Sequence, residues 1–324
     1  MKICIFGAGA VGGVIGGMLA RAGHEVSLVA RGAQLEAIRK SGLTVIDGDV
    51  RFTVEARASD DPTDLGPQDH VIVAVKAPAL PSVAKAISPL LGPETAVVTA
   101  MNGIPWWFFD GFPANGPEIA IPALDPDGGI ACSIPTDRVI GCVVHMGAAV
   151  PEPGTVRRVA GGLLILGEAA GPVSPRVTAL AQAFAGTPLE VRTTDALRQE
   201  IWLKLLGNFN FAPISALTGA TNGRIGADPG LRALCAAMFD EAAEAGRRLG
   251  LDPGMTADER TDLGAALGDF KTSMLQDFEK GRRPEIDAIV GAVASLGPAI
   301  GVPMPVTDAM LSLLAAKARG MGLY

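Results

Sequence analysis

The feature that most constrains the fold is a glycine-rich turn near the start of the chain, in "KICIFGAGAVGG". The apolar run over residues 2–9 predicts a buried strand that leads into this turn, and residues 11–23 predict a helix that ends at a glycine. Residues 24–31 then predict a second strand. Together they make a β-α-β unit of about thirty residues, the building block of parallel sheets.

The glycines of this turn, Gly7, Gly9 and Gly12, have the spacing G-x-G-x-x-G. The first permits a tight turn, the second lets the backbone approach a pyrophosphate, and the third lets the helix pack closely. The alternative is a glycine turn without a ligand, but the strand-turn-helix context favours a dinucleotide. The cofactor-binding residues expected here are Gly7, Ala8, Gly9, Ala10, Val11 and Gly12.

Arg31 stands at the end of the second strand, where an NAD-binding chain usually has an acidic residue. A carboxylate there would accept hydrogen bonds from the ribose hydroxyls, whereas a guanidinium can bind a phosphate with two parallel hydrogen bonds. The alternative is a surface arginine at a strand end. We interpret Arg31 as the residue that reads the 2′-phosphate, which predicts NADPH as the cofactor.

Further along the chain, residues 70–76 and 96–103 predict two more strands with a helix between them. Residues 105–153 are rich in proline, glycine and aromatic side chains and predict loops with a few late strands, and residues 154–168 predict a closing hairpin. From Asp195 onward helical periodicity dominates. The predicted fold is α/β: a Rossmann-type, doubly wound parallel sheet domain over residues 1–193 and an all-helical domain over residues 194–324.

Composition excludes several classes of protein. No apolar run approaches the ~18 residues that span a bilayer, and the N-terminus does not resemble a leader peptide, so we expect a cytoplasmic protein. The four cysteines form no CxxC pair and the three histidines show no ligand spacing, so neither a disulfide framework nor a metal site is expected. The net charge of -7, without clustered basic residues, disfavours nucleic acid. The expected partners are a small molecule and, as one option, a second copy of the chain in a homodimer.

Lys76 and Asn102 end the third and fourth predicted strands. Open α/β sheets bind ligands at the carboxyl ends of their strands, so both are candidates for contact with cofactor or substrate. A solvated strand end is the alternative for the lysine.

In the helical region, Lys204 and Asn208 are spaced i, i+4, so they lie on one helix face. A lysine in a closing cleft can donate a proton to a carbonyl oxygen as hydride reaches the carbon. A surface lysine on an amphipathic helix is the alternative. Against it stand the apolar neighbours of Lys204 in sequence: Trp202, Leu203, Leu205 and Leu206.

Glu285 follows Pro284 at a predicted helix start, where the helix dipole favours a carboxylate. Such a group suits holding an ammonium or a ribose hydroxyl of the nicotinamide nucleotide, although helix capping alone would explain it.

The chain resembles the ketopantoate reductases (2-dehydropantoate 2-reductases) over nearly its whole length. The resemblance rests on "GAGAVG", Arg31, "VKA" at Lys76, "NG" at Asn102, "WLKLLGN", "TNG" at Asn222, "SMLQD" and "RRPEID". It implies NADPH-dependent reduction of a 2-keto acid in pantothenate synthesis. It also implies Lys204 as general acid, Glu285 as a catalytic and cofactor-binding carboxylate, Ser273 as a ligand of the substrate carboxylate, and Asn208 and Asn222 as amides of the substrate pocket.

This sequence departs from the family pattern at two positions. Ala212 and Phe270 replace asparagines that the family often has, which removes polar partners for a substrate. In the aromatic loop "IPWWFFDGF", Trp106 and Trp107 either wall the pocket or anchor the loop. Three hypotheses follow: a ketopantoate reductase, a reductase of the same fold for another branched or aromatic 2-keto acid, and a non-catalytic NADPH-binding regulator. The retained Lys204 argues against the last of these, because a sensor has no use for a proton donor.

Overall fold

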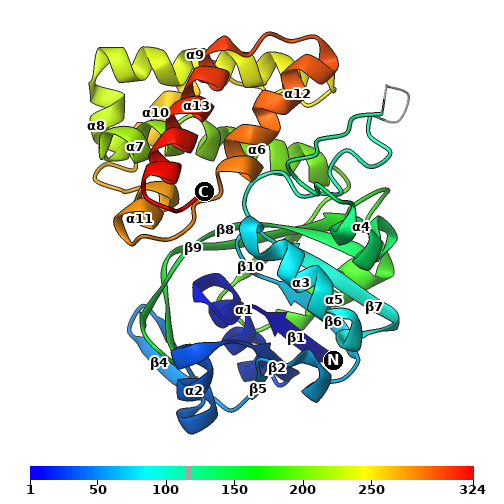
Figure 1. The fold of residues 1–324 in the computed structure, drawn as a ribbon. Coiled ribbons are helices and arrows are strands. Elements are labelled where there is room, and N and C mark those ends of the chain that lie inside the picture. Colours follow the sequence, from blue (N-terminus) through cyan, green and yellow to red (C-terminus); the bar gives the residue numbers. More distant parts are fainter. Residues whose placement is uncertain (114–117) are drawn as a thin grey trace. The chain divides into compact units, whose positions relative to one another are not determined.

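The computed structural model describes residues 1–113 and 118–324. The chain divides into two compact units (Figure 1). The first comprises Met1–Met101 and Asp127–Leu197, and the second comprises Asn102–Pro126 and Arg198–Tyr324. The segment after Asn102 therefore leaves the first unit and packs with the helices of the second.

The strands of the first unit are β1 (Lys2–Phe6), β2 (Glu25–Val29), β3 (Leu43–Asp47), β4 (Val50–Val54), β5 (Arg57–Ser59), β6 (Gln68–Val73), β7 (Leu91–Ala100), β8 (Val139–Glu152), β9 (Thr155–Glu168) and β10 (Glu190–Thr193). Within the described residues they form one ten-stranded sheet with the order β4-β3-β9-β8-β7-β6-β1-β2-β5, and β10 pairs with β9. The pairs β3–β4 and β8–β9 are antiparallel and the others are parallel. The predicted α/β class with a largely parallel sheet is confirmed.

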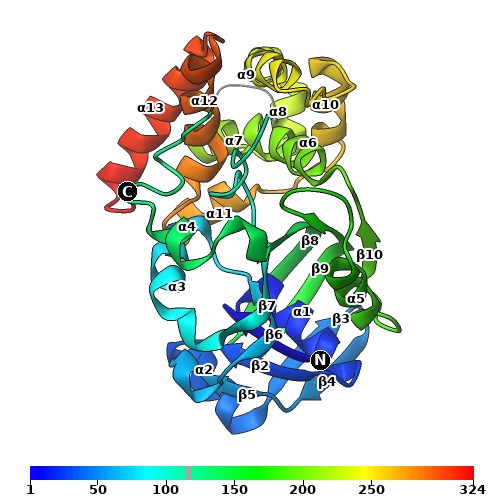
Figure 2. The same ribbon diagram turned by 90° about the vertical axis from the view of Figure 1, so that its right-hand side faces the viewer.

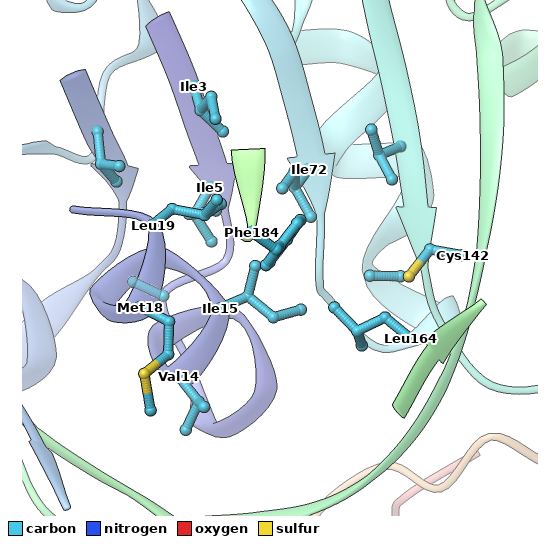
Figure 3. Close-up of a cluster of buried hydrophobic side chains, with 14 of the residues drawn as sticks. Ile3, Ile5, Val14, Ile15, Met18, Leu19, Ile72, Cys142, Leu164 and Phe184 are labelled. Atoms are coloured by element: carbon cyan, nitrogen blue, oxygen red, sulfur yellow. The ribbon is translucent and has the colours of Figure 1, made fainter. Parts of the chain in front are cut away.

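The helices of the first unit are α1 (Ala10–Arg21), α2 (Gly32–Ser41), α3 (Leu80–Ala86), α4 (Gly129–Ser133) and α5 (Pro175–Ala183), with short 3-10 turns η1 (Pro62–Asp64), η2 (Ala77–Ala79), η3 (Ser88–Leu90) and η4 (Thr136–Arg138). Side chains from α1, β1, β6 and β9 meet in one apolar core, which includes Ile5, Ile15, Ile72 and Leu164 (Figure 3).

The sheet curls where β8 and β9 pair over their whole length as long curved strands (Figure 1). The register of this pair shifts after His145, opposite Gly161, which has a φ of 68°. A Cβ on Gly161 would lie 2.4 Å from the carbonyl oxygen of His145, so only glycine fits at this bend. The first part of β9 pairs with β3 and its later part with β10. The prediction of a hairpin within residues 154–168 is therefore wrong: this segment is one strand, and its hairpin partner is β8.

Helix α1 packs closely against this curled sheet because one side of it carries no side chains. A Cβ on Gly13 would lie 2.5 Å from Cγ1 of Val156 on β9, and a Cβ on Gly17 would lie 2.3 Å from Cγ2 of Val45 on β3. Neither approach is possible with any residue but glycine. The glycines of α1 thus fix how near the helix lies to the strands, and with it the position of the turn that precedes it.

The second unit consists of α6 (Leu197–Phe209), α7 (Ala212–Thr218), α8 (Asn222–Ala227), α9 (Pro229–Arg248), α10 (Ala257–Ala265), α11 (Ser273–Glu279), a π-helical turn η5 (Asp287–Gly291), α12 (Ala292–Ile300) and α13 (Pro305–Gly320). Helices α12 and α13 lie beside one another and both contact α9 (Figure 2). The predicted helical character of the C-terminal region is confirmed.

A carboxylate of α9 fixes the start of α13. Glu241 accepts hydrogen bonds of 2.8 Å from the backbone N–H of Val306 and 2.9 Å from that of Thr307. These are first-turn donors that have no partner within the helix, and Pro305 at the first helical position needs none. A negative charge at this end also opposes the positive end of the helix dipole.

The segment after Asn102 is anchored in the second unit by α6. Arg198 donates hydrogen bonds of 2.8 Å from Nε to the carbonyl of Phe108 and 2.8 Å from Nη2 to that of Asp110. Burial lowers the pKa of Arg198. The indole of Trp107 is only 1% exposed. This burial favours the anchoring role of Trp107 over that of a pocket wall.

Candidate active site

The glycine turn of the first unit has the conformation that the motif predicts. Gly7 has a φ of 103°, and a Cβ there would lie 2.6 Å from Cγ1 of Val75. The backbone N–H groups of Gly7 and Ala8 both donate to the carbonyl of Val29, at 3.0 and 3.1 Å. The turn is therefore tied to the end of β2, as a phosphate loop of a β-α-β unit requires.

The N-terminus of α1 leaves room for an anion. Gly9 is the N-cap residue, has no side chain to cap the first turn, and has nothing within 4 Å of the place where a Cβ would stand. Ala10 and Val11, which open the helix, are half-buried. Unpartnered N–H groups and the positive end of a helix dipole stabilise a phosphate at such a position. A Cβ on Gly12 would lie 2.2 Å from the carbonyl oxygen of Gly7, so the third glycine is a packing requirement.

Arg31 is exposed and serves as the N-cap residue of α2 in extended conformation. Its backbone carbonyl accepts from Leu35, while no side-chain partner of its guanidinium occurs within the described chain. Arg31 lies two residues beyond Val29, the strand end to which the glycine turn is hydrogen-bonded. Because its guanidinium has no carboxylate partner, it can bind a phosphate.

A residue that no sequence motif indicates connects these two parts. Gln34, in the first turn of α2, donates from Nε2 to the carbonyl of Ala8 at 2.9 Å and accepts at Oε1 from the N–H of Gly154 at 2.9 Å. It thereby joins the glycine turn, α2 and the β8–β9 turn. The only sequence signal for this role is an amide side chain in the first turn of a predicted helix, three residues after Arg31. The sequence does not indicate its distant partners, Ala8 and Gly154.

Lys76 and Asn102 belong to different units. Lys76 lies three residues beyond β6 and is the N-cap residue of η2, where it is half-buried. Asn102 follows β7 by two residues and belongs to the second unit. In the sequence the two residues look like equivalent strand ends, whereas in the structure Asn102 belongs to the helical unit.

Lys204 and Asn102 are brought together within the second unit. Nζ of Lys204 donates a hydrogen bond of 2.8 Å to Oδ1 of Asn102. The lysine is half-buried on α6, with Trp202, Leu205 and Leu206 buried on its other side. A neutral amide oxygen orients the ammonium without neutralising its charge, which leaves it able to donate a proton.

Glu285 is 6% exposed and directly precedes the helical residues that lead into η5. Its carbonyl accepts from the N–H of Ile289, at 3.2 Å. One turn further, the carbonyl of Ala288 accepts from the N–H of Ile104 at 2.8 Å, and Gly103, with a φ of 79°, has no room for a Cβ against Ala288. The turn that carries Glu285 is thus the surface on which the loop of Asn102 docks. Single π-helical turns occur frequently at functional sites.

The three remaining candidates differ in environment. Asn208 is half-buried on α6, and its amide has no partner among the residues that the structure describes. Asn222 is 4% exposed, donates from Nδ2 to the carbonyl of Gly264 at 3.2 Å, and has a buried Oδ1 without a partner. Ser273 is exposed at the first position of α11. Unsatisfied amide atoms in a buried position are expected where a ligand binds.

The two departures from the family pattern lie in different surroundings. Ala212 is 3% exposed at the start of α7, whereas Phe270 is 48% exposed and its carbonyl accepts from the N–H of Asn222. Within residues 1–113 and 118–324, no group of three or more His, Cys, Asp or Glu could hold a metal ion. No described helix is both long and apolar enough to cross a membrane.

Comparisons with known proteins assign the family. The chain matches the family described as "Ketopantoate reductase PanE/ApbA" over residues 3–171 and its C-terminal part over residues 196–318. A 2-dehydropantoate 2-reductase of Mesorhizobium japonicum is 45% identical over 325 residues, which cover 100% of both chains. A crystal structure from Ralstonia solanacearum that carries the ketopantoate reductase name is 47% identical, covers 99% of each chain and has a TM-score of 0.93.

A more distant structure shares the fold. D-mandelate dehydrogenase with NADH and anilino(oxo)acetate has a TM-score of 0.83 at 22% identity, with 100% of both chains covered. The match of both family regions and the full-length identity agree with the glycine turn and the helical unit described above. The chain is a member of the ketopantoate reductase family.

Proposed function

We propose that this protein reduces a 2-keto acid to a 2-hydroxy acid with NADPH, and that ketopantoate is its first candidate substrate. The observation that carries the proposal is the hydrogen bond between Lys204 and Asn102, which holds an ammonium ready to protonate a carbonyl oxygen. Full-length similarity to a 2-dehydropantoate 2-reductase supports it.

The first unit fits a dinucleotide. The tight turn at Gly7, the open position above Gly9 and the exposed guanidinium of Arg31 match a pyrophosphate and a 2′-phosphate. When bound, the cofactor supplies the hydride that reduces the keto carbon. The preference for NADPH over NADH rests on Arg31.

The second unit supplies the groups that act on the substrate. Lys204 would hold the keto oxygen and transfer a proton from Nζ to it as negative charge develops there. Asn102 would keep the ammonium in place. Asn208 and Asn222 have amide atoms without protein partners and would bind polar groups of the acid. Glu285, at the edge of η5, would hold a ribose hydroxyl or the ammonium.

A second candidate substrate class is favoured by the exposed ring of Phe270, three residues before Ser273. An aromatic side chain where the family often has an amide favours branched or aromatic 2-keto acids without a hydroxyl. The cytoplasmic location and the homodimer stay predictions from the sequence.

The test is to follow the absorbance of NADPH with the purified protein and three acids: ketopantoate, 2-keto-3-methylbutyrate and phenylpyruvate. Oxidation of NADPH that depends on ketopantoate supports the main proposal. Turnover with the other acids alone supports the second candidate. Binding of NADPH without turnover of any acid would favour a regulator and contradict the proposal.

A further inference from the structure

Arg260 of α10 lies with its guanidinium against the backbone of α6. A Cβ built on Gly207 would be 2.2 Å from Nη2 of Arg260 and 3.1 Å from its Cζ. Only a glycine therefore leaves room for the guanidinium at this point. The contact is made by the charged end of the side chain and not by its aliphatic stem.

This guanidinium has no acidic partner, unlike other arginines of the same unit. Arg232 of α9 forms ion pairs with Asp258 and Asp262, at 3.0 and 2.7 Å. Both aspartates lie on α10, the helix that also carries Arg260. Across the described parts of the chain, no hydrogen bond or ion pair of Arg260 is found, and its Nε is buried without a partner. Burial lowers the pKa of Arg260, and no charge opposes this effect. Placing an unpaired cation there costs folding free energy, and a bound anion would offset that cost.

The position of Arg260 is next to the groups that the proposed reaction uses. Gly207, which it covers, lies three residues after Lys204 and directly before Asn208 on the half-buried face of α6. One turn further along α10, the carbonyl of Gly264 accepts from Asn222. The guanidinium thus contacts the α6 backbone between Lys204 and Asn208, and the helix that carries it also contacts Asn222, all within the second unit.

We propose that Arg260 binds the carboxylate of the 2-keto acid. The inference rests on the proposed function, because it assigns the anion of that same substrate. The carboxylate carbon is bonded to the keto carbon, so a cation near Lys204 can hold one group while the lysine holds the other. The planar fork of a guanidinium matches both carboxylate oxygens, which the hydroxyl of Ser273 cannot do alone.

The first test is binding to the protein loaded with NADP⁺, which cannot react with a keto acid. Titration calorimetry with 2-keto-3-methylbutyrate would compare the wild type with Arg260→Gln, Arg260→Lys and Gly207→Ala. We expect about 10–100-fold weaker binding for Arg260→Gln, the range for losing a charge-assisted contact, and an intermediate loss for Arg260→Lys. Gly207→Ala should also weaken binding, because its Cβ displaces the guanidinium. Arg232→Gln is the matched control: it removes a cation that contacts α10 and should bind as the wild type does.

The second test asks whether the carboxylate is the group recognised. In NADPH oxidation, the preference of the wild type for the free acid over its methyl ester should shrink about 10–100-fold in Arg260→Gln. The melting temperature of Arg260→Gln without ligand should not fall, because the substitution removes no ion pair or hydrogen bond and relieves a partly buried, unpaired cation. An equal loss of activity on acid and ester together with a lower melting temperature would make Arg260 a structural residue and overturn the inference.

The two proposals can fail separately. If the wild type turns over keto acids and Arg260→Gln binds them equally well, the carboxylate assignment is wrong and the reductase stands. If the wild type binds the acid through Arg260 but reduces none, the reductase is wrong and the anion site stands. If the wild type neither binds nor reduces any of the acids, both are wrong.

Discussion

Nζ of Lys204 lies 2.8 Å from Oδ1 of Asn102, although 102 positions separate the two residues in the chain. The contact joins two motifs that are unrelated in the sequence: "NG" at Asn102, which follows a strand, and "WLKLLGN" at Lys204, which lies on a helix. An amide oxygen can only accept, so this hydrogen bond requires the ammonium to point one N–H at Asn102.

Lys204→Ala should lower kcat about a hundredfold or more, the usual effect of removing a general acid, while the Kd for NADPH is preserved. Steady-state kinetics and a fluorescence titration of NADPH measure the two quantities. Lys317→Ala is a suitable control, because this lysine of the helical unit donates to the carbonyl of Ala216 instead. A Lys204→Ala variant that keeps most of its kcat would move the proton donor elsewhere.

Arg31→Ala should weaken the binding of NADPH and leave that of NADH nearly unchanged, since only the contact to the 2′-phosphate is lost. One charge-assisted bidentate contact contributes roughly 1.5–3 kcal/mol. Titrations of the wild type and of Arg31→Ala with NADPH and with NADH give the change in Kd for each cofactor. Arg39→Ala is the control on the same helix, where the guanidinium donates to the carbonyl of Ala58. Equal weakening of both cofactors would show that Arg31 has another role.

Substrate selectivity should be loose. A pocket that hydrogen-bonds a hydroxyl rejects analogues without it by about 10⁴-fold or more, whereas an apolar pocket discriminates by only about 10–200-fold per group. With Ala212 and Phe270 in place of amides, we expect ketopantoate, 2-keto-3-methylbutyrate and phenylpyruvate to lie within about a hundredfold in kcat/KM. A preference for ketopantoate above about 10⁴-fold would contradict this, and would assign the missing contacts to Asn208, Asn222 or Asn210.

The stability of the protein should fall in mild acid because of His70. This histidine of β6 is 5% exposed, and both ring nitrogens are buried without a partner. Burial lowers its pKa, against a smaller opposing effect of Asp69. Below its unfolded pKa of about 6.5, the unfolded chain binds a proton that the folded chain does not, so stability is lost as the pH falls.

Urea unfolding at several pH values tests this effect. The wild type should lose up to about 1.4 kcal/mol per pH unit more than His70→Leu below pH ~6.5. His24→Gln, which removes a hydrogen bond to the carbonyl of Ala183, controls for the loss of any histidine. Parallel pH dependences of the wild type and His70→Leu would contradict the prediction.

Thiol reactivity should distinguish one cysteine from the others. Burial raises the pKa of Cys4 and of Cys235 to about 12, Cys142 is also buried, and Cys132 is exposed. Because the thiolate is the nucleophile, Cys132 alone should react quickly with a disulfide reagent at neutral pH. The native protein should release about one equivalent of the reagent's thiol per chain. The urea-unfolded protein should release about four, one for each cysteine. Fast reaction of Cys132→Ser would show that a buried thiol is accessible.

The local geometry of the glycine turn and of α6 was predictable from sequence, because each of these motifs has a physical reason of its own. The spacing of Gly7, Gly9 and Gly12 predicts the turn that the structure shows, and the helical period places Lys204 beside Asn208. Long-range contacts were not predictable. Nothing in the sequence indicates that Gln34 contacts both Ala8 and Gly154, or that Arg260 covers Gly207.

Some elements were missed because their local signal is weak. The short strands β3, β4 and β5 have partly exposed patterns and depend on neighbouring strands for their hydrogen bonds. The sequence predicts a hairpin within residues 154–168, whereas in the structure these residues form one strand with a bulge near Gly161. Glycine is compatible with both a hairpin turn and a β-bulge, and which of them forms depends on the strand that pairs with the segment.

The close packing of α1 against β3 and β9 has a consequence for the thermodynamics of binding. Because Gly13 and Gly17 lie within contact distance of valines on two strands, the helix cannot shift without opening the apolar core. The phosphate-binding turn is therefore preorganised before any ligand arrives, and association does not have to overcome a loss of backbone entropy there. The affinity of the turn for a dinucleotide is set in advance by the folding of the sheet.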